Sequence, residues 1–239
     1  MRIPRVYLDM ALPIGQHIDL PQACSHYLSK VLRCQLQQKI ILFNGDGRQI
    51  AASIIGINKK TVTVLLHKTV NSPNPSALRT YLGQVISRGN RMDYVVQKAT
   101  EMGVNEITPL YSERCEVKLD HQRYHKRMQH WQRIVINACE QSGRCDVPIM
   151  HLPQTVNAWI ASCKAEIKLI MHPYDSATLN DKDKPNSCAL LIGPEGGFTH
   201  AEVNYAKQRE FIAINLGPRI LRTETATVVS LSLLQHLWG

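Results

Sequence analysis

The densest cluster of chemically active side chains lies near the C-terminus, in Leu216-Gly217-Pro218-Arg219-Ile220-Leu221-Arg222-Thr223-Glu224-Thr225-Ala226. Arg219 and Arg222 are three residues apart, so both guanidinium groups could reach one anion. The simpler alternative is structural, with Thr223 or Thr225 capping a final helix and the arginines forming surface ion pairs. Such a density of charges and hydroxyls beside a Gly-Pro turn favours a ligand site.

A second loop with the same character lies upstream, at Ile192-Gly193-Pro194-Glu195-Gly196-Gly197-Phe198. It follows an apolar segment that reads as a buried strand, and open α/β sheets bind ligands where their strands end. Glycines let the backbone approach a ligand closely. The sequence contains neither a Gly-Lys-Ser/Thr P-loop nor G-x-G-x-x-G, so nucleotide fingerprints are missing. The alternative for this segment alone is a tight turn between a strand and a helix.

Other reactive residues give weaker patterns. His121 and His125 have the spacing of a zinc-binding pair, but Gln122 stands where H-E-x-x-H has its glutamate, and we expect no metal. The seven cysteines are odd in number and include no C-x-x-C pair, which favours reduced thiols over disulfides. No Ser-His-Asp or Cys-His relay can be read from the spacing.

The net charge of +9 is unevenly distributed along the 239 residues. Residues 1–78 hold nine Lys/Arg and three Asp/Glu, whereas residues 79–239 hold nineteen and sixteen. This asymmetry predicts a polyanionic partner that meets the N-terminal part. No apolar run approaches the roughly 18–20 residues of a membrane span, and no signal-peptide core follows the N-terminus, so we expect a cytoplasmic protein with no membrane partner.

The best domain boundary is the proline-containing stretch 71–76, which cannot be helical. Residues 1–72 should form a small β-barrel with strands at 39–43, 49–55 and 61–66, a hairpin turn at Asn44-Gly45-Asp46-Gly47, and a short helix over 23–32.

Residues 73–239 should form an α/β domain with a largely parallel sheet, because strands and helices alternate. Strands are expected at 80–87, 106–110, 167–171, 189–192 and 212–216. Helices are expected at 92–102, 122–141, 155–163, 199–208 and 224–238. The last helix is too apolar for a free surface, so it should be buried in the core or at a subunit interface.

In the two loops 192–198 and 216–226 the chain resembles the RsmE-type ribosomal RNA methyltransferases of the SPOUT class. The two loops carry the resemblance, together with Ser87-Arg88-Gly89, Gln97-Lys98-Ala99-Thr100-Glu101-Met102-Gly103-Val104 and Ala138-Cys139-Glu140-Gln141-Ser142-Gly143-Arg144. The match runs nearly end to end, with small departures such as Tyr94 and Asn137. The resemblance implies a PUA-like N-terminal barrel, a SPOUT domain with a deep C-terminal trefoil knot, and a homodimer.

The resemblance also implies a reaction: methylation of N3 of one uridine in 16S ribosomal RNA of the small subunit, with S-adenosylmethionine as the donor. Arg222 would stabilise the developing negative charge on the base, with Arg219 and Arg144 as neighbours. Glu224 could accept the proton. Its alternative role is structural, as a carboxylate that the positive end of a helix dipole stabilises. The implied cofactor-binding residues are Met171, His172, Gly193, Pro194, Gly197, Leu216, Gly217, Arg219, Ile220, Leu221 and Thr225.

Basic side chains should position the RNA by contacting its phosphates. Such contacts set the register of the RNA on the protein but do not read its bases. The expected contacts are Arg2, Arg5, Arg33, Arg48, Lys59, Lys60, Arg88 and Arg91.

The sequence leaves three rival functions open. They are a non-catalytic RNA-binding or ribosome-assembly factor, a dinucleotide-dependent oxidoreductase, and the same methyl transfer to a different RNA.

Overall fold

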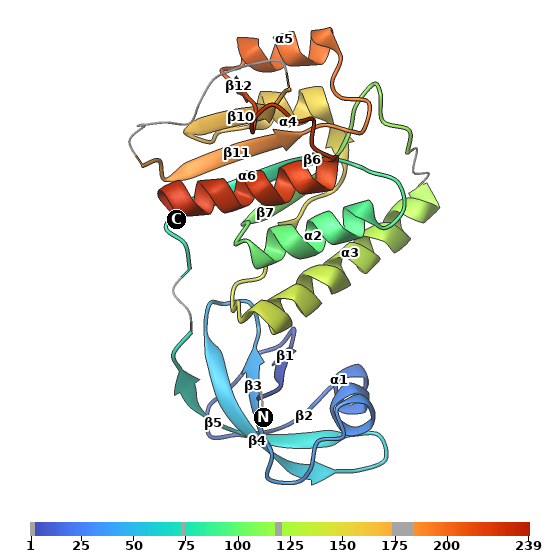
Figure 1. Ribbon diagram of the computed structural model, residues 1–239. Helices are drawn as coiled ribbons and strands as arrows, with labels where there is room; N and C mark the ends of the chain where they lie inside the picture. The colour runs from blue at the N-terminus through green and yellow to red at the C-terminus, as the bar shows by residue number, and fades with distance from the viewer. Residues whose placement is uncertain (1–2, 73–74, 118–120, 174–183) are drawn as a thin grey trace. The chain divides into compact units, whose positions relative to one another are not determined.

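The computed structural model describes residues 3–72, 75–117, 121–173 and 184–239 (Figure 1). The chain divides into two compact units. The first comprises Met1–Pro75 with Cys139–Val147, and the second comprises Ser76–Ala138 with Pro148–Gly239. The first unit thus includes a late segment, 139–147, that lies beyond the expected boundary between residues 72 and 73.

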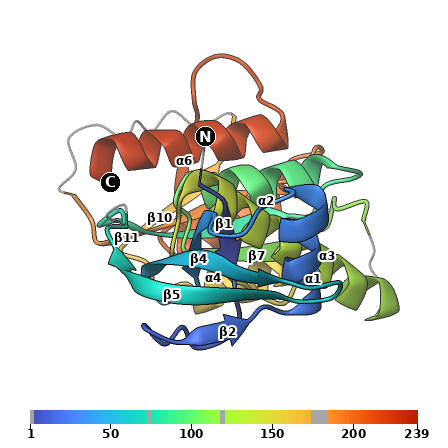
Figure 2. The same ribbon diagram turned by 90° about the horizontal axis from the view of Figure 1, so that it is seen from below.

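The first unit is built on a five-stranded sheet with the order β1-β3-β4-β5-β2, of which Figure 2 shows β4, β5 and β2 side by side. Strand β1 pairs with β3 in parallel, and the other neighbours are antiparallel. Helix α1 (Gln22–His26) continues into one π-helical turn, η1 (Tyr27–Val31), where the sequence predicted a short helix. The strands are β1 (Arg5–Tyr7), β2 (His17–Asp19), β3 (Lys39–Phe43), β4 (Gln49–Ile57) and β5 (Val62–Val70).

The predicted β3–β4 hairpin is confirmed. Its strands pair from Lys39 opposite Ser53 to Phe43 opposite Gln49. Gly45 and Gly47 in the turn have φ of +92° and +85°, a backbone region that favours glycine. The pairing buries one apolar core formed by Val6, Leu8, Leu20, Leu28, Ile40, Leu42, Ile50, Ile54, Val62, Val64 and Leu66.

The second unit contains a parallel sheet with the order β12-β10-β11-β6-β7-β8, and β9 also pairs with β7. The predicted alternation of strands and helices is confirmed. The strands are β6 (Arg79–Val85), β7 (Glu106–Tyr111), β8 (Ile149–Met150), β9 (Gln154–Thr155), β10 (Ile167–Met171), β11 (Ser187–Ile192) and β12 (Ile212–Ile214). The helices are α2 (Arg91–Glu101), α3 (His121–Ser142), α4 (Val156–Ser162), α5 (His200–Gln208) and α6 (Thr223–Trp238).

The centre of this sheet is covered on both faces, which is why β11 is an unbroken apolar run from Cys188 to Ile192. Trp159 of α4 and Val203 of α5 belong to the apolar cluster that covers Ala189 and Leu191 on one face. Helices α2 and α6 lie side by side, and α6 also contacts β11 (Figure 1).

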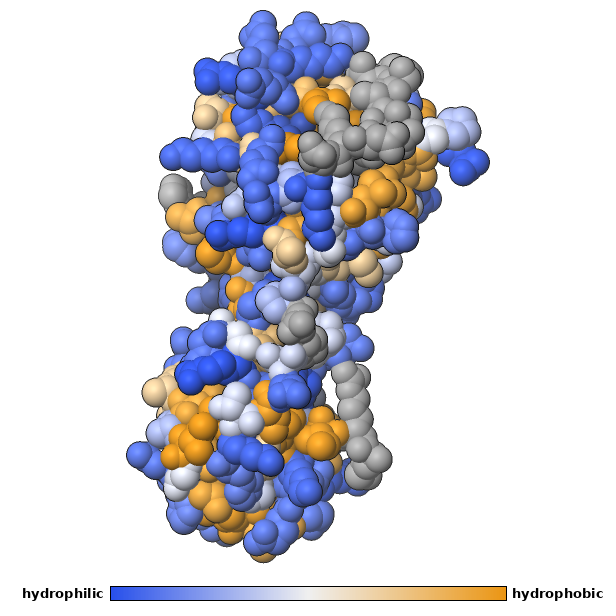
Figure 3. All heavy atoms as spheres, turned by 90° about the vertical axis from the view of Figure 1, so that its left-hand side faces the viewer, coloured by the Kyte–Doolittle hydropathy of each residue, from blue (hydrophilic) through white to orange (hydrophobic). Residues whose placement is uncertain are grey.

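Helix α6 is buried on one face only. Its inward face includes Leu231, Leu234 and Trp238, whereas Val229 and Leu237 on the other face are 41% and 42% exposed. Figure 3 likewise shows apolar patches between hydrophilic residues on one side of the molecule. Within the described part of the chain, no helix combines the length and apolarity that crossing a bilayer requires.

Candidate functional site

Three neighbouring strands deliver their following loops to the same edge of the sheet. In the parallel order β12-β10-β11, Met171 of β10 pairs with Ile214 of β12, and Ile170 pairs with Leu191 of β11. The strands therefore end at nearly the same level. The segments 172–173, 193–198 and 215–222 all leave at this edge, where open parallel sheets usually bind ligands.

The loop after β11 is shaped by glycine. Gly197 has φ of +68°, and its N–H donates to the carbonyl of Pro194 at 2.9 Å. A Cβ atom on Gly193 would lie 3.0 Å from the ring of Phe198, so any larger residue there would need the ring to shift. The loop ends in α5, which Thr199 and Glu202 cap reciprocally. The segment is thus a tight turn between strand and helix, and it also lines a cavity.

The loop after β12 runs through Gly217, at φ of +93°, to the start of α6. Ile220 at its tip is 77% exposed. The N-cap of α6 is Arg222, whose side chain makes no capping hydrogen bond. The structural alternative of a threonine cap is therefore wrong, because Thr223 is already inside the helix and its hydroxyl donates to the carbonyl of Gly193 at 2.8 Å.

These segments enclose a cavity of about 530 Å³. The predicted charge-stabilising and proton-accepting residues, Arg222 and Glu224, both line it. Thr225 lies one position farther along α6 and lines a neighbouring cavity instead. The other predicted cofactor-binding residues all line the first cavity: Met171, His172, Gly193, Pro194, Gly197, Leu216, Gly217, Arg219, Ile220 and Leu221.

Two arginines outside the cavity loops hold the loop after β11. Arg91 Nη1 lies 2.6 Å from Glu195 Oε1, and Arg114 Nη1 donates to the carbonyl of Gly196 at 2.9 Å. Both arginines also line the cavity. The sequence pattern did not single out Arg114, because nothing local distinguishes it from a solvated arginine.

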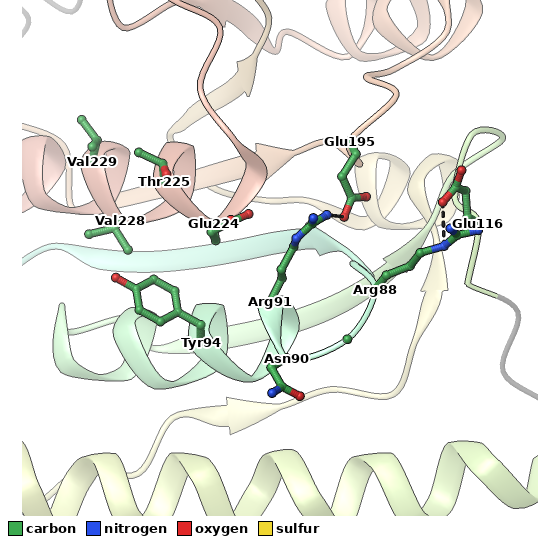
Figure 4. A pocket seen from close by; sticks show the side chains of 11 residues that line it. Arg88, Asn90, Arg91, Tyr94, Glu116, Glu195, Glu224, Thr225, Val228 and Val229 are labelled. Atoms are coloured by element: carbon green, nitrogen blue, oxygen red, sulfur yellow. Dashed lines mark hydrogen bonds and ion pairs between the residues drawn. The ribbon is translucent and has the colours of Figure 1, made fainter.

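The neighbouring cavity has a volume of about 890 Å³ and lies between the N-terminal ends of α2 and α6 (Figure 4). Arg91, Glu195 and Glu224 line both cavities. Figure 4 shows Arg91 extending from α2 to Glu195, while Arg88 pairs with Glu116 at 2.6 Å. Arg88 and Arg91, both predicted RNA contacts, are therefore exposed at the rim of this cavity.

Glu224 differs from the other carboxylates near the cavities. Its Oε2 atom is buried and has no hydrogen-bond partner among the described residues. A buried acceptor without a partner costs free energy, so such an atom is a natural place for a ligand that donates a hydrogen bond.

The predicted neighbour Arg144 belongs to the first unit, whereas the residues that line the two cavities belong to the second. Its Nη2 atom lies 2.5 Å from Asp146 Oδ2, and its carbonyl accepts a hydrogen bond from Arg5 Nη2 at 2.9 Å. Arg5 also donates to Gln49 and lies over the ring of Phe43. The guanidinium of Arg5 is thus engaged inside its own unit.

The other predicted RNA contacts of the first unit that the structure describes are exposed. Arg33, Lys59 and Lys60 lie on its surface, and Arg48 forms an exposed ion pair with Asp46 at 2.6 Å. Arg2 lies outside the described residues. These side chains can present positive charge to a polyanion.

None of the seven cysteines forms a disulfide. Burial raises the pKa of the Cys139 and Cys188 thiols to about 12. Thiols with raised pKa values are protonated at neutral pH and are poor nucleophiles. These two thiols are therefore poor candidates for a catalytic nucleophile.

Comparison with known families agrees with this geometry. A family model described as an RNA methyltransferase domain matches residues 74–235, and one described as an RNA methyltransferase PUA domain matches residues 22–66. The chain belongs to this family of RNA methyltransferases. The resemblance to RsmE-type proteins seen in the sequence is thereby confirmed.

Similar members of the family match over the whole chain. Ribosomal RNA small subunit methyltransferase E of Buchnera aphidicola (subsp. Schizaphis graminum) is 39% identical, with 100% of this chain and 98% of the relative covered. The Neisseria gonorrhoeae protein of that name, solved bound to S-adenosyl methionine, is 39% identical with a TM-score of 0.94. A Legionella pneumophila methyltransferase, solved with its bound cofactor SAM, is 40% identical with a TM-score of 0.96. In both structures the match covers 100% of this chain and 99% of the other.

Besides Arg114, sequence reasoning missed a buried residue that supports the site. Gln84, at the carboxyl end of β6, is completely buried and contacts Thr223 and Thr227 of α6. The sequence feature that could have pointed to Gln84 is a single amide side chain inside the otherwise apolar segment 81–85. This segment belongs to a strand that pairs with β11.

Proposed function

We propose that this chain is an S-adenosylmethionine-dependent methyltransferase that methylates N3 of a specific uridine in 16S ribosomal RNA. The observation that carries the proposal is the cavity at the carboxyl edge of β12, β10 and β11, bounded by glycine-bearing loops. The comparisons support the proposal as well, because two solved proteins that match nearly the full length of this chain contain this cofactor.

The residues present fit such a cofactor. A volume of about 530 Å³ lies inside the range of roughly 300–1,000 Å³ typical of small-molecule sites. Met171, Leu216 and Leu221 offer apolar surface for an adenosine, and the glycines expose backbone groups to it. Arg219 and Glu195 offer partners for the carboxylate and ammonium ends of the amino acid part. When bound, S-adenosylmethionine supplies an activated methyl group on a sulfonium sulfur.

The chain's own residues then act on the uridine. Loss of the N3 proton places negative charge on the base oxygens, and the Arg222 guanidinium at the cavity wall stabilises that charge. Glu224, with its unpartnered Oε2 atom, accepts the proton or holds the N3–H before it leaves. Arg219 contributes positive charge from the same loop. Arg144 stays a proposed neighbour, although its guanidinium is paired with Asp146.

The acceptor nucleotide enters through the larger cavity beside the cofactor cavity. The two cavities share Arg91, Glu195 and Glu224, so a base in one can reach a donor in the other. Arg88 and Arg91 at the rim bind phosphates, and Arg33, Arg48, Lys59 and Lys60 of the first unit bind more distant parts of the RNA.

The finer architecture belongs to the same proposal: a PUA-like β-barrel over residues 1–72 and a trefoil knot within residues 73–239. The knot is supported by the course of the last segment. From β12 at one end of the sheet the chain passes the 193–198 loop, and α6 then packs against β11 and α2.

We further propose a homodimer in the cytoplasm. Val229 and Leu237 form an exposed apolar stripe on α6, and Tyr94 on the adjacent α2 is 46% exposed. Exposed apolar side chains on neighbouring helices are typical of a protein interface. Because Val229 and Tyr94 also line the larger cavity, the partner subunit would border the entry of the nucleotide.

The direct test is transfer in vitro. The purified protein is incubated with S-adenosylmethionine and either isolated small ribosomal subunits or naked 16S RNA, and the RNA is digested for mass spectrometry. We expect one N3-methyluridine per RNA in at least one substrate. A folded protein that methylates neither, or methylates a different atom, would refute the proposal.

A further inference from the structure

Both N–H groups and the oxygen of the Gln84 amide form hydrogen bonds inside the protein. Nε2 donates to the carbonyl of Val85 at 3.0 Å and to Thr223 Oγ1 at 2.9 Å. Oε1 accepts from Thr227 Oγ1 at 2.7 Å, and the Thr227 hydroxyl also lies 2.9 Å from the carbonyl of Thr223. Because the Val85 carbonyl can only accept, the orientation of the amide is fixed.

This orientation determines the direction of the next hydrogen bond. The Thr223 hydroxyl accepts from Gln84, so its single hydrogen is available for the carbonyl of Gly193, 2.8 Å away. A chain of hydrogen bonds thus runs in one direction from the interior of β6 to the first residue of the 193–198 loop. Gln84, Thr223 and Thr227 are 0%, 6% and 0% exposed, so water does not compete for these bonds.

The chain of bonds ties together both loops that bound the cofactor cavity. Gly193 begins the loop after β11, and its carbonyl belongs to the peptide that joins it to Pro194. Thr223 is the first residue of α6, directly after the loop that follows β12, and it stands between Arg222 and Glu224. A shift of the Thr223 backbone would therefore move both proposed catalytic side chains relative to the first loop.

We propose that Gln84, Thr223 and Thr227 are positioning residues whose directed hydrogen bonds set the spacing of the two cavity loops and hold Arg222 and Glu224 in register with the cofactor site. The catalytic part rests on the proposed function, whereas the coupling of the loops does not. These residues act through the loops, because their polar atoms are already satisfied by one another.

The coupling can be tested without any ligand. Hydrogen–deuterium exchange is compared between the wild type, Thr223→Val, Thr223→Ser and Thr100→Val. Valine keeps the shape of threonine without its hydroxyl, and serine keeps the hydroxyl. Thr100 is the matched control, since it is a fully buried threonine of the same unit whose hydroxyl donates to the carbonyl of Val96.

We expect amides of the 193–198 and 215–222 segments to exchange at least about tenfold faster in Thr223→Val, as expected for loss of a hydrogen bond worth about 1.4 kcal/mol. In Thr223→Ser and Thr100→Val they should stay near the wild-type rate. Unchanged exchange of both segments in Thr223→Val would overturn the proposal. If Thr223→Val does not fold, Thr227→Val removes the outer bond of the chain and should accelerate the same segments.

The catalytic consequence is measured separately, below the melting temperature of each variant. In Thr223→Val the single-turnover rate of methyl transfer should fall at least tenfold, and Thr223→Ser should restore it. A purely structural role would lower only the melting temperature. Loss of loop coupling together with a wild-type rate would refute the catalytic role. A wild type that never methylates RNA would refute the proposed function and leave the exchange result standing.

Discussion

At the scale of single residues, Arg222 and Glu224 flank the buried Thr223 at the beginning of α6, and both line the cavity. The sequence already indicated both, because three charges and two hydroxyls follow a Gly-Pro turn. Gln84 could not be predicted in the same way, since its role depends on partners 139 and 143 positions away.

Arg222→Ala should lower the rate of methyl transfer by about 10² to 10³ while changing cofactor affinity by less than about fivefold. The reason is that a preorganised charge acts mainly on the transition state. Single-turnover kinetics and calorimetry separate the two effects. Arg209→Ala, an exposed arginine of the same unit that stacks on Tyr205, serves as the control. Near-normal transfer by Arg222→Ala would remove this residue from the mechanism.

At the scale of elements, the periodic pattern predicted the long strands and helices and the edge where the loops meet. It missed β1, β2, β8 and β9, which have only two or three residues and cannot show a period. It also could not predict that residues 139–147 join the first unit. That attachment depends on distant contacts, such as the Tyr7 N–H donating to Glu140 and Arg5 donating to the carbonyl of Arg144.

Reversing three exposed charges of the first unit, with Arg33→Glu, Lys59→Glu and Lys60→Glu, should weaken RNA binding and flatten its salt dependence. Each phosphate contact contributes about 0.7 to 0.9 to the slope of log K against log salt, so the slope should fall by about 2 to 3. Filter binding of the RNA at several salt concentrations measures this slope. The control reverses Lys164, Lys207 and Arg209 on the second unit. An unchanged slope would place RNA docking elsewhere.

At the scale of the whole molecule, the exposed stripe on α6 is the feature that a lone subunit leaves unexplained. Val229→Glu with Leu237→Glu should convert a dimer into monomers, because a charge on an apolar interface cannot be solvated there. Sedimentation equilibrium measures the mass. The control, Ile149→Glu with Leu152→Glu, changes two apolar residues of the same unit that are 54% and 67% exposed. A wild type that is monomeric at working concentration would contradict the proposed dimer.

The central claim is that the glycine-bearing loops form an S-adenosylmethionine site, and calorimetry with that compound tests it most directly. We expect one molecule bound per chain. Gly217→Val should weaken binding at least tenfold, because valine is strained at φ of +93°. Gly15→Val is the matched control, with φ of +81° and open space around its Cβ position in the first unit. Absence of binding by the folded wild type, or equal affinities in the two variants, would contradict the account.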